Sequence, residues 1–328
     1  MRFFFTLLFI CFATISFGQD IHLTQYYTSN LSLNPAFTGF YNGDVRLTAN
    51  YRSQWRQVSS SIKTNMFSIE KKFARFNDEI GVGFIVMKDY LNVNHLNINR
   101  ALLSISAQKE VNDNFFRLGL QAGVTHRTIN YASQTFPDQW DYPVGDFNQS
   151  LSSGEPSIQS SRMFPDINAG AGWTRRFGNK KVTVGYALFH MNKPRYGFIN
   201  RDQRLPFRHV INSSVTFNLA DQIFVRPHLL YMRASGATDL ILGTNVGKRI
   251  NKDVVVMGGL GFRGSTNSDA CLAIVGLTYK RIDFGFSYDF NISELSKDSR
   301  NKSAIEFSLI YTTPSRIPHK ITLPCDRY

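Results

Sequence analysis

The feature that most constrains this chain is a two-residue alternation of apolar and polar side chains. In the stretch 44–55, apolar residues occupy every second position from Val45 to Tyr51, and polar residues occupy the positions between them. A period of two indicates an extended strand with one apolar and one polar face. The pattern returns often enough to predict about fourteen strands, a number within the range of bacterial barrels. The predicted strands are 44–54, 61–73, 79–89, 98–110, 115–130, 166–177, 181–191, 207–219, 223–233, 239–249, 253–263, 270–279, 282–290 and 303–313.

The apolar faces of these strands are large and aromatic, whereas the opposite faces are rich in Gly, Thr, Asn and Arg. In the strand at 282–290, Phe284 and Phe286 alternate with Asp283 and Gly285. Most of the segments have the length of about ten residues that a tilted strand needs to cross the hydrocarbon layer. The pattern therefore favours lipid over a protein core as the neighbour of the apolar faces.

The connections between the predicted strands alternate between longer loops and very short turns. Residues 131–165 form the longest loop, whereas residues 178–180 and 280–281 leave room only for tight turns. Outer-membrane barrels have long external loops and short periplasmic turns. A two-sheet sandwich does not require this regular alternation of long and short connections. We therefore predict an all-β fold: a single transmembrane antiparallel β-barrel over residues 44–313, with both termini in the periplasm.

The two ends of the chain complete the predicted domain organisation. Residues 1–18 read as a signal peptide, with a basic start, an apolar stretch and a small-residue cleavage site. Residues 19–43 are expected to form a periplasmic N-terminal segment, and residues 314–328 a Pro-rich periplasmic tail. The predicted location is the outer membrane of a Gram-negative cell, with outer-membrane lipid around the barrel.

Charge and cysteine content narrow the possible partners. The formal net charge is +13, but an exported chain has no nucleic acid to bind, so basic side chains that line a lumen or face an anionic surface are the better explanation. After signal removal Cys271 and Cys325 remain, and two distant cysteines do not make a disulfide framework. We expect no cofactor.

Nothing in the sequence marks a catalytic or metal site. Four histidines lie on separate predicted strands and lack the spacing of metalloprotease or hydrolase motifs. They are His126, His190, His209 and His228. A hydrolase needs a nucleophile, a base and an orienting group together, so we do not expect an enzyme.

Five short motifs carry a family resemblance. Residues 25–27 (QYY), 34–39 (NPAFTG) and 50–55 (NYRSQW) lie near the start, and residues 287–293 (SYDFNIS) and 306–309 (EFSL) near the end. With these motifs the chain resembles the PorP/SprF family of outer-membrane proteins of the type IX secretion system, found in Bacteroidota. The resemblance implies an integral barrel that helps particular cargo proteins, including gliding adhesins, to reach the cell surface. It also implies two kinds of partner, namely cargo with a C-terminal sorting domain and other components of the secretion system.

The motif residues are candidate site residues with two interpretations. They are Asn34, Pro35, Gly39, Tyr51, Arg52, Gln54 and Trp55. Residues 34–39 could contact a partner or plug the barrel from below, but we favour a turn that launches the first strand. Arg52 could recognise cargo, but we favour an ion pair in the lumen, because a buried arginine needs a carboxylate. The inward-facing candidate carboxylates are Asp44, Asp283, Asp289 and Glu306.

Two functions fit the predicted barrel. The first is a non-enzymatic secretion component that contacts cargo through strands and loops. The second is a passive porin or small-molecule transporter. A barrel of this size encloses space. A filled lumen would favour the first function, and an open pore with a charged constriction the second.

Overall fold

A computed structural model describes residues 23–55, 61–75, 78–92, 95–130, 135–154, 160–198, 202–220, 222–265, 270–292 and 303–315. The predicted signal peptide at 1–18, the tail from residue 316 onward and Cys325 lie outside the described residues.

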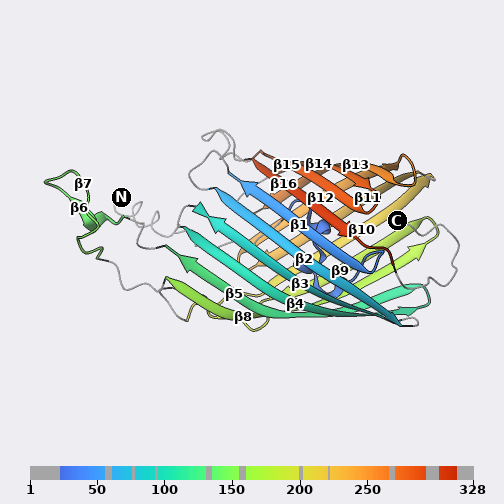
Figure 1. The fold of residues 1–328 in the computed structure, drawn as a ribbon, viewed down its shortest axis with the longest axis horizontal. Coiled ribbons are helices and arrows are strands. Elements are labelled where there is room, and N and C mark those ends of the chain that lie inside the picture. The colour runs from blue at the N-terminus through green and yellow to red at the C-terminus, as the bar shows by residue number, and fades with distance from the viewer. Residues whose placement is uncertain are drawn as a thin grey trace, which may run out of the picture.

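Fourteen strands form one closed antiparallel barrel (Figure 1). Each strand pairs with its neighbours along the chain, and β16 closes the ring by pairing with β1. The strands are β1 (Val45–Gln54), β2 (Ile62–Arg75), β3 (Asp78–Leu91), β4 (Leu96–Val111), β5 (Asn114–Ile129), β8 (Ser161–Phe177), β9 (Lys180–Phe189), β10 (Arg208–Ala220), β11 (Ile223–Ala234), β12 (Ala237–Arg249), β13 (Val254–Ser265), β14 (Ala270–Tyr279), β15 (Ile282–Asn291) and β16 (Ala304–Thr312). The predicted barrel is confirmed. Among the described residues, no helix is both long and apolar enough to cross a membrane.

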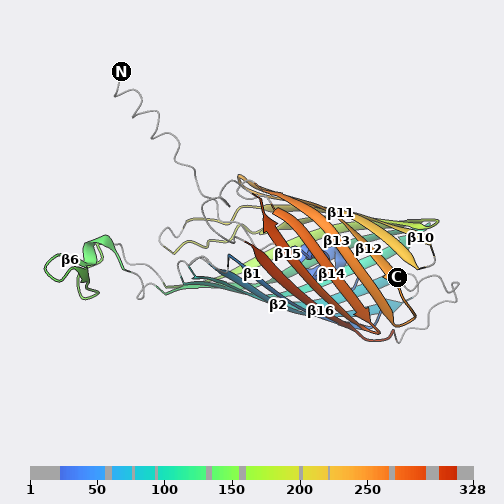
Figure 2. The same ribbon diagram turned by 90° about the horizontal axis from the view of Figure 1, so that it is seen from above.

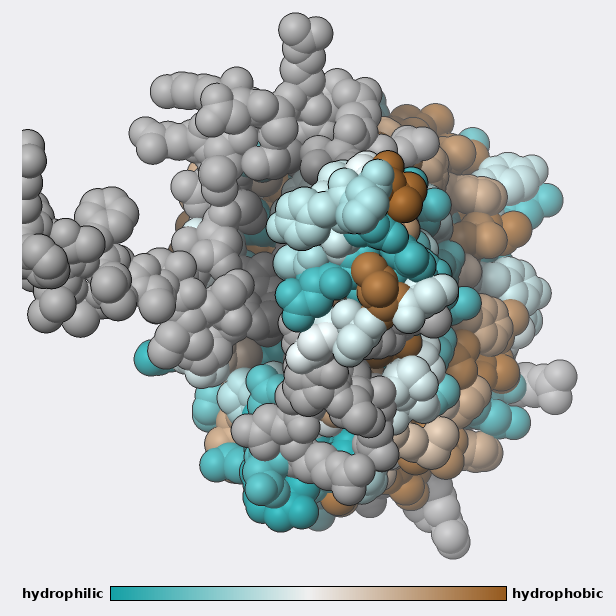
Figure 3. All heavy atoms as spheres, turned by 90° about the vertical axis from the view of Figure 1, so that its left-hand side faces the viewer, coloured by the Kyte–Doolittle hydropathy of each residue, from teal (hydrophilic) through white to brown (hydrophobic). Residues whose placement is uncertain are grey.

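The alternation in sequence becomes an alternation between the outer wall and the lumen. On β5, Leu118 and Leu120 are 69% and 60% exposed on the outer wall, whereas Arg117 and Gln121 are buried inside. Figure 3 looks onto the end of the barrel that carries the longer loops, and hydrophobic residues lie along the outer wall on its right-hand side. Such an apolar outer band is what a lipid-facing barrel requires.

Strand β8 begins at Ser161, five residues before the expected start at 166. Pro165 lies within it, paired with Val124 of β5. The pairing of β8 with β9 begins only at Ala169, so residues 161–168 have a strand neighbour on one side alone. Pro is tolerated at such an edge because its missing N–H costs no ladder bond there, and the sequence pattern does not reveal which stretch is an edge.

One end of the barrel carries the short turns, and we refer to it as the turn end; the other is the loop end. Asn112 and Asp113 have φ of 50° and 61°, and Lys280 has φ of 56°, the left-handed backbone that tight hairpins require. β1 begins and β16 ends at the turn end (Figure 1).

Residues 23–43 lie inside the barrel, which corrects their expected position in a separate periplasmic segment. They form three short turns of helix, η1 (Tyr26–Thr28), α2 (Asn30–Leu33) and η2 (Pro35–Phe37). We call residues 23–41 the plug. It runs from the loop end, where Thr24 contacts Arg52 near the end of β1, to the turn end, where Tyr41 contacts Asp44.

The lumen is also less polar than its glycine- and asparagine-rich strands suggested. Leu31 of the plug is fully buried in a hydrophobic cluster with Ile85, Leu230 and Ile241 of the wall. A barrel of this size encloses more space than its own inward side chains fill. The plug fills that space and brings apolar surface of its own out of water.

Candidate functional site

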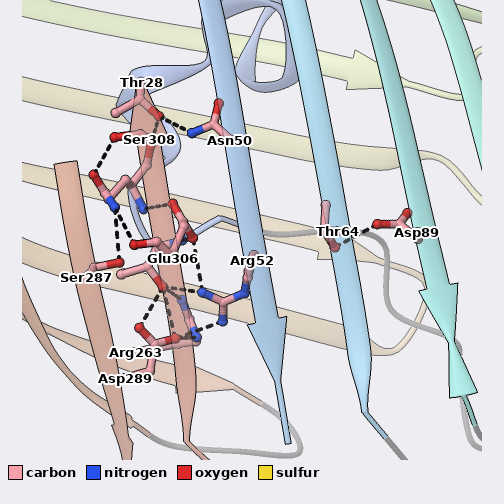
Figure 4. A network of polar contacts seen from close by, with 12 residues as sticks. Thr28, Asn50, Arg52, Thr64, Asp89, Arg263, Ser287, Asp289, Glu306 and Ser308 are labelled. Atoms are coloured by element: carbon pink, nitrogen blue, oxygen red, sulfur yellow. Dashed lines mark hydrogen bonds and ion pairs between the residues drawn. The ribbon is translucent and has the colours of Figure 1, made fainter. Parts of the chain in front are cut away.

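The loop-end half of the plug is held by a carboxylate that binds its backbone. Glu306 on β16 accepts hydrogen bonds from the backbone N–H of Thr24 at 2.8 Å and of Gln25 at 2.9 Å. The hydroxyl of Thr24 donates to Asp289 on β15 at 2.8 Å. These contacts satisfy the backbone N–H groups of Thr24 and Gln25 without any helix or sheet. Figure 4 shows Glu306 and Asp289 close to Arg52 and Arg263.

Two arginines neutralise these two carboxylates. Arg52 on β1 lies 2.8 Å from Asp289 and 3.1 Å from Glu306, and Arg263 on β13 lies 2.8 Å from Asp289. Both guanidinium groups also donate to the hydroxyl of Thr24, at 2.6 and 2.8 Å. Buried charges are tolerated when they are paired and hydrogen-bonded in this way. We call these four charged residues the charge cluster.

Arg52 therefore forms an ion pair in the lumen, and two of its four candidate carboxylates are its partners. The register of the barrel explains the pairing, because Arg52 lies directly opposite Glu306 across the β1–β16 closure. Sequence reasoning missed Arg263. Its inward position in β13 was readable from the alternation, but its nearness to Asp289 depends on the register in which β13, β14 and β15 pair.

The C-terminal motifs of the sequence hold Gln25 through their inward positions. Ser308 donates to Oε1 of Gln25 at 2.9 Å, and Nε2 of Gln25 donates to Ser287 at 3.3 Å. Ser287 and Asp289 are alternate residues of one motif, and Glu306 and Ser308 of the other. Both motifs thus contact the N-terminal motif at 25–27, although the sequence separates them by more than 250 residues.

Asn34 fixes the middle of the plug. Its Oδ1 accepts the N–H of Ala36 at 2.9 Å, which starts η2, and its Nδ2 donates to the carbonyls of Ala171 at 3.1 Å and Tyr186 at 3.2 Å. One side chain therefore caps a helical turn and ties it to the wall at β8 and β9. Pro35 follows at the first helical position, where its missing N–H is not needed.

Glycines on the inner wall make room for this motif. A Cβ on Gly119 would overlap the backbone of Pro35, and one on Gly170 would overlap Oδ1 of Asn34. The plug backbone approaches the strands so closely that no larger residue fits. The sequence showed inward glycines, but not that they face one motif.

The turn-end half of the plug is held by a second carboxylate. Glu70 on β2 accepts the N–H of Gly39 at 2.9 Å, and Gly39 has the left-handed φ of 75° that suits glycine. Tyr41 contacts the carbonyl of Glu70 at 2.8 Å. Residues 34–39 thus combine a plug with the turn that leads into β1.

Phe40 completes the turn-end closure. The guanidinium of Arg117 lies 3.9 Å from the centre of its ring, and the ammonium of Lys181 lies 4.9 Å from it. Both cations come from the inner wall, so part of the positive charge of the chain lines the lumen, as the composition suggested.

Only some of the seven predicted site residues lie in the lumen. Asn34, Pro35, Gly39 and Arg52 all contact the plug or belong to it. Tyr51 faces outward and is 37% exposed. Gln54 ends β1, and Trp55 follows with a φ of 55° and donates its N–H to the carbonyl of Ser303 at 3.0 Å. The seven residues therefore do not form one site.

Each of the four histidines contacts a different residue. Their ring-nitrogen partners are Ser161 for His126, Asp166 for His190, Tyr186 for His209 and Tyr26 for His228. Within the described ranges, no three His, Cys, Asp or Glu side chains gather closely enough to hold a metal ion.

The sequence as a whole matches the family model of the type IX secretion system membrane protein PorP/SprF over residues 15–311. This chain belongs to the PorP/SprF family. Membership accords with the transmembrane barrel and connects it with the type IX secretion system. No curated protein sequence matches the chain.

Solved structures similar to this PorP/SprF barrel are outer-membrane proteins of low sequence identity. The CymD monoaromatic hydrocarbon channel has a TM-score of 0.53 at 11% identity, covering 88% of this chain and 94% of its own. The P. putida toluene transporter TodX has a TM-score of 0.51 at 11% identity, covering 88% and 95%. A Pseudomonas aeruginosa FadL homologue has a TM-score of 0.50 at 12% identity, covering 85% and 92%. At these identities the likeness concerns the fold alone.

Proposed function

We propose that this PorP/SprF protein is a non-enzymatic outer-membrane component of the type IX secretion system that helps specific cargo proteins reach or attach to the cell surface. The cargo is recognised through its C-terminal sorting domain, and gliding adhesins are the expected class. Contact through strands and loops serves this role without covalent chemistry. Other components of the secretion system are the further partners.

The observation that carries this proposal is the filled lumen. Two carboxylates, Glu306 and Glu70, bind the backbone of the plug at its two ends, and Asn34 and the glycines hold its middle. A cavity beside the plug measures about 40 Å³, whereas small-molecule sites occupy several hundred Å³. A lumen built around the protein's own chain supports a role in which the barrel binds other proteins.

The orientation follows from the same parity that predicted the barrel. We propose that the loop end faces the cell exterior and the turn end the periplasm. The end of β16 then delivers the C-terminal tail to the periplasm. The plug starts near the loop end, so its first described residues lie in the outer half of the lumen, not below the barrel.

The alternative is a passive porin or small-molecule transporter. The titles of the similar structures describe channels and transporters, but the likeness covers only the fold. The luminal contacts of the plug disfavour free passage. This alternative requires that the plug leave its place.

A deletion strain tests the proposal. Its cell-surface and culture-medium proteomes are compared with those of the parent and of a strain complemented with the full chain. We expect a few specific surface proteins with C-terminal sorting domains to be lost while bulk secretion is unchanged. An unchanged secretome together with altered solute uptake would reject the proposal in favour of the transporter.

A further inference from the structure

The long connection between β5 and β8 carries a small folded unit of its own. Residues 135–154 contain η5 (Pro137–Gln139) and a hairpin of β6 (Trp140–Asp141) and β7 (Asp146–Phe147). We call this unit the loop hairpin. Figures 1 and 2 show it at the loop end, well away from the barrel wall.

The loop hairpin holds its shape through its own hydrogen bonds. Buried Gln139 is the centre: its carbonyl accepts the N–H of Asn148 at 2.8 Å, and its Nε2 donates to the carbonyl of Leu151 at 3.2 Å. At the tip, Gly145 donates to the carbonyl of Asp141 at 2.7 Å. These three hydrogen bonds all lie within residues 135–154.

This unit exposes large apolar side chains to water. Tyr142 is 87% exposed and Val144 72% exposed, and Trp140, Phe147 and Leu151 are exposed as well. The exposed aromatics of the barrel wall have lipid as their neighbour, whereas these side chains do not. A two-stranded hairpin is marginal by itself, and clustered exposed apolar residues on a water-facing surface mark sites of protein contact.

The aromatic pair at the base of the hairpin is preformed. The rings of Trp140 and Phe147 lie edge to face, with centroids 5.0 Å apart. Trp and Tyr are the side chains most often found in the energetic centre of protein interfaces. Because the pair is already ordered, binding would lose little side-chain entropy.

The charge of the loop hairpin is opposite to that of the chain. Residues 135–154 include Asp138, Asp141 and Asp146 but no Lys or Arg, whereas the whole chain carries +13. Complementary charge steers encounter and excludes wrong partners. A unit that carries three carboxylates beside exposed aromatic residues fits a surface that has an apolar groove bordered by Lys and Arg.

We propose that the loop hairpin is a docking element that inserts its aromatic residues into an apolar groove, bordered by basic residues, on a different protein at the cell exterior. This inference rests on residues 135–154 and on the orientation proposed above, which puts the loop end at the cell exterior, and not on the proposed cargo role. It assigns a second contact surface, separate from the lumen.

The test places a photo-crosslinking amino acid at Tyr142 of the full-length protein in its native cells. We expect one discrete adduct whose partner peptide, identified by mass spectrometry, lies in an apolar surface flanked by Lys or Arg. The matched control is the same label at Asp202, a loop-end position whose side chain is 82% exposed, where we expect no adduct with that partner.

Two sets of substitutions in the labelled protein test the chemistry. Trp140→Ala with Phe147→Ala should lower the adduct yield about tenfold or more, as expected for interface aromatics. Replacing the three Asp residues with Asn should lower the yield several-fold at low salt and less at high salt. Folded barrel in the outer membrane, measured by heat-modifiable mobility, should stay at wild-type levels.

Several outcomes overturn the proposal. They are an adduct with lipopolysaccharide, with the barrel itself or with a second copy of the chain, the absence of an adduct, and a yield that the aromatic substitutions leave unchanged. Unchanged surface and medium proteomes in the deletion strain would reject the proposed function, whereas the adduct at Tyr142 in cells that carry the labelled protein would leave this inference intact.

Discussion

At the scale of single residues, the lumen is organised by carboxylates that bind backbone N–H groups. Glu306 and Glu70 each accept from the plug backbone and each lie near an arginine of β1, Arg52 at 3.1 Å and Arg46 at 3.9 Å. Each carboxylate thus lies near an arginine and also accepts a hydrogen bond from the plug backbone. Losing the carboxylate leaves several polar groups without a partner at once.

We predict that Glu306→Gln destabilises the folded barrel by about 3 kcal/mol, because breaking a buried ion pair leaves a charge without compensation. Urea unfolding in lipid vesicles measures this. Glu79→Gln is the control, since Glu79 is 33% exposed and lies 3.6 Å from Lys72, and it should cost less than about 1 kcal/mol. Equal stability of the two variants would contradict the role of the charge cluster.

The inner-wall glycines give a second prediction. Gly170→Ala should push Asn34 out of place and cost about 1–3 kcal/mol, the usual range for overpacking. Gly258→Ala is the control, because a Cβ on Gly258 meets nothing within 4 Å. Limited proteolysis should cut the plug of the first variant faster than that of the second. Identical cleavage rates would show that the plug does not need the glycine.

At the scale of elements, each wall strand separates two environments by alternation alone. The outward residues of β5 meet lipid, and its inward residues meet the plug: Gln121 donates to the carbonyl of Leu31 at 3.0 Å. The two faces of a strand therefore have different neighbours. A substitution on the lipid-facing side should have a different effect from a substitution on the lumen-facing side.

Leu120→Arg should reduce the amount of assembled barrel, at a cost of about 2–4 kcal/mol for a charge at mid-membrane depth. Leu120→Met is the conservative control. The measurement is the heat-modifiable, folded fraction in isolated outer membranes. Wild-type levels of the arginine variant would mean that this face does not contact lipid.

At the scale of the whole molecule, the plug connects parts of the wall that are far apart in sequence. It contacts β1, β2, β15 and β16 through charges, and β8 and β9 through Asn34. Because it threads the lumen from the loop end to the turn end, we expect the plug to close the barrel.

Removing residues 24–40 should convert a barrel of low conductance into an open pore. Planar-bilayer recording of the purified variant and of the full chain measures the difference. Glu306→Gln with Glu70→Gln, which keeps the plug but weakens both of its anchors, should give intermediate, flickering conductance. Unchanged conductance in both variants would mean that other parts of the chain block the lumen.

Much of the wall was determined by the sequence itself. Alternation has a period of two and is local, so strand positions, the facing of Leu120 and the parity of loops and turns could be predicted without coordinates. The same reasoning placed Arg52 in the lumen and required a carboxylate for it. Pro165 marks where local reasoning failed, because whether a strand stretch is an edge depends on its neighbours.

The interior was decided only by the tertiary structure. The three helical turns of the plug are three or four residues long, too short to show a period, so nothing local distinguishes them from a periplasmic loop. The contact of Arg52 with Glu306 depends on closing the β1–β16 seam, which brings together two residues that lie 254 positions apart in the sequence. Local pattern sets which way a side chain faces, whereas closure of the ring sets which side chain it meets.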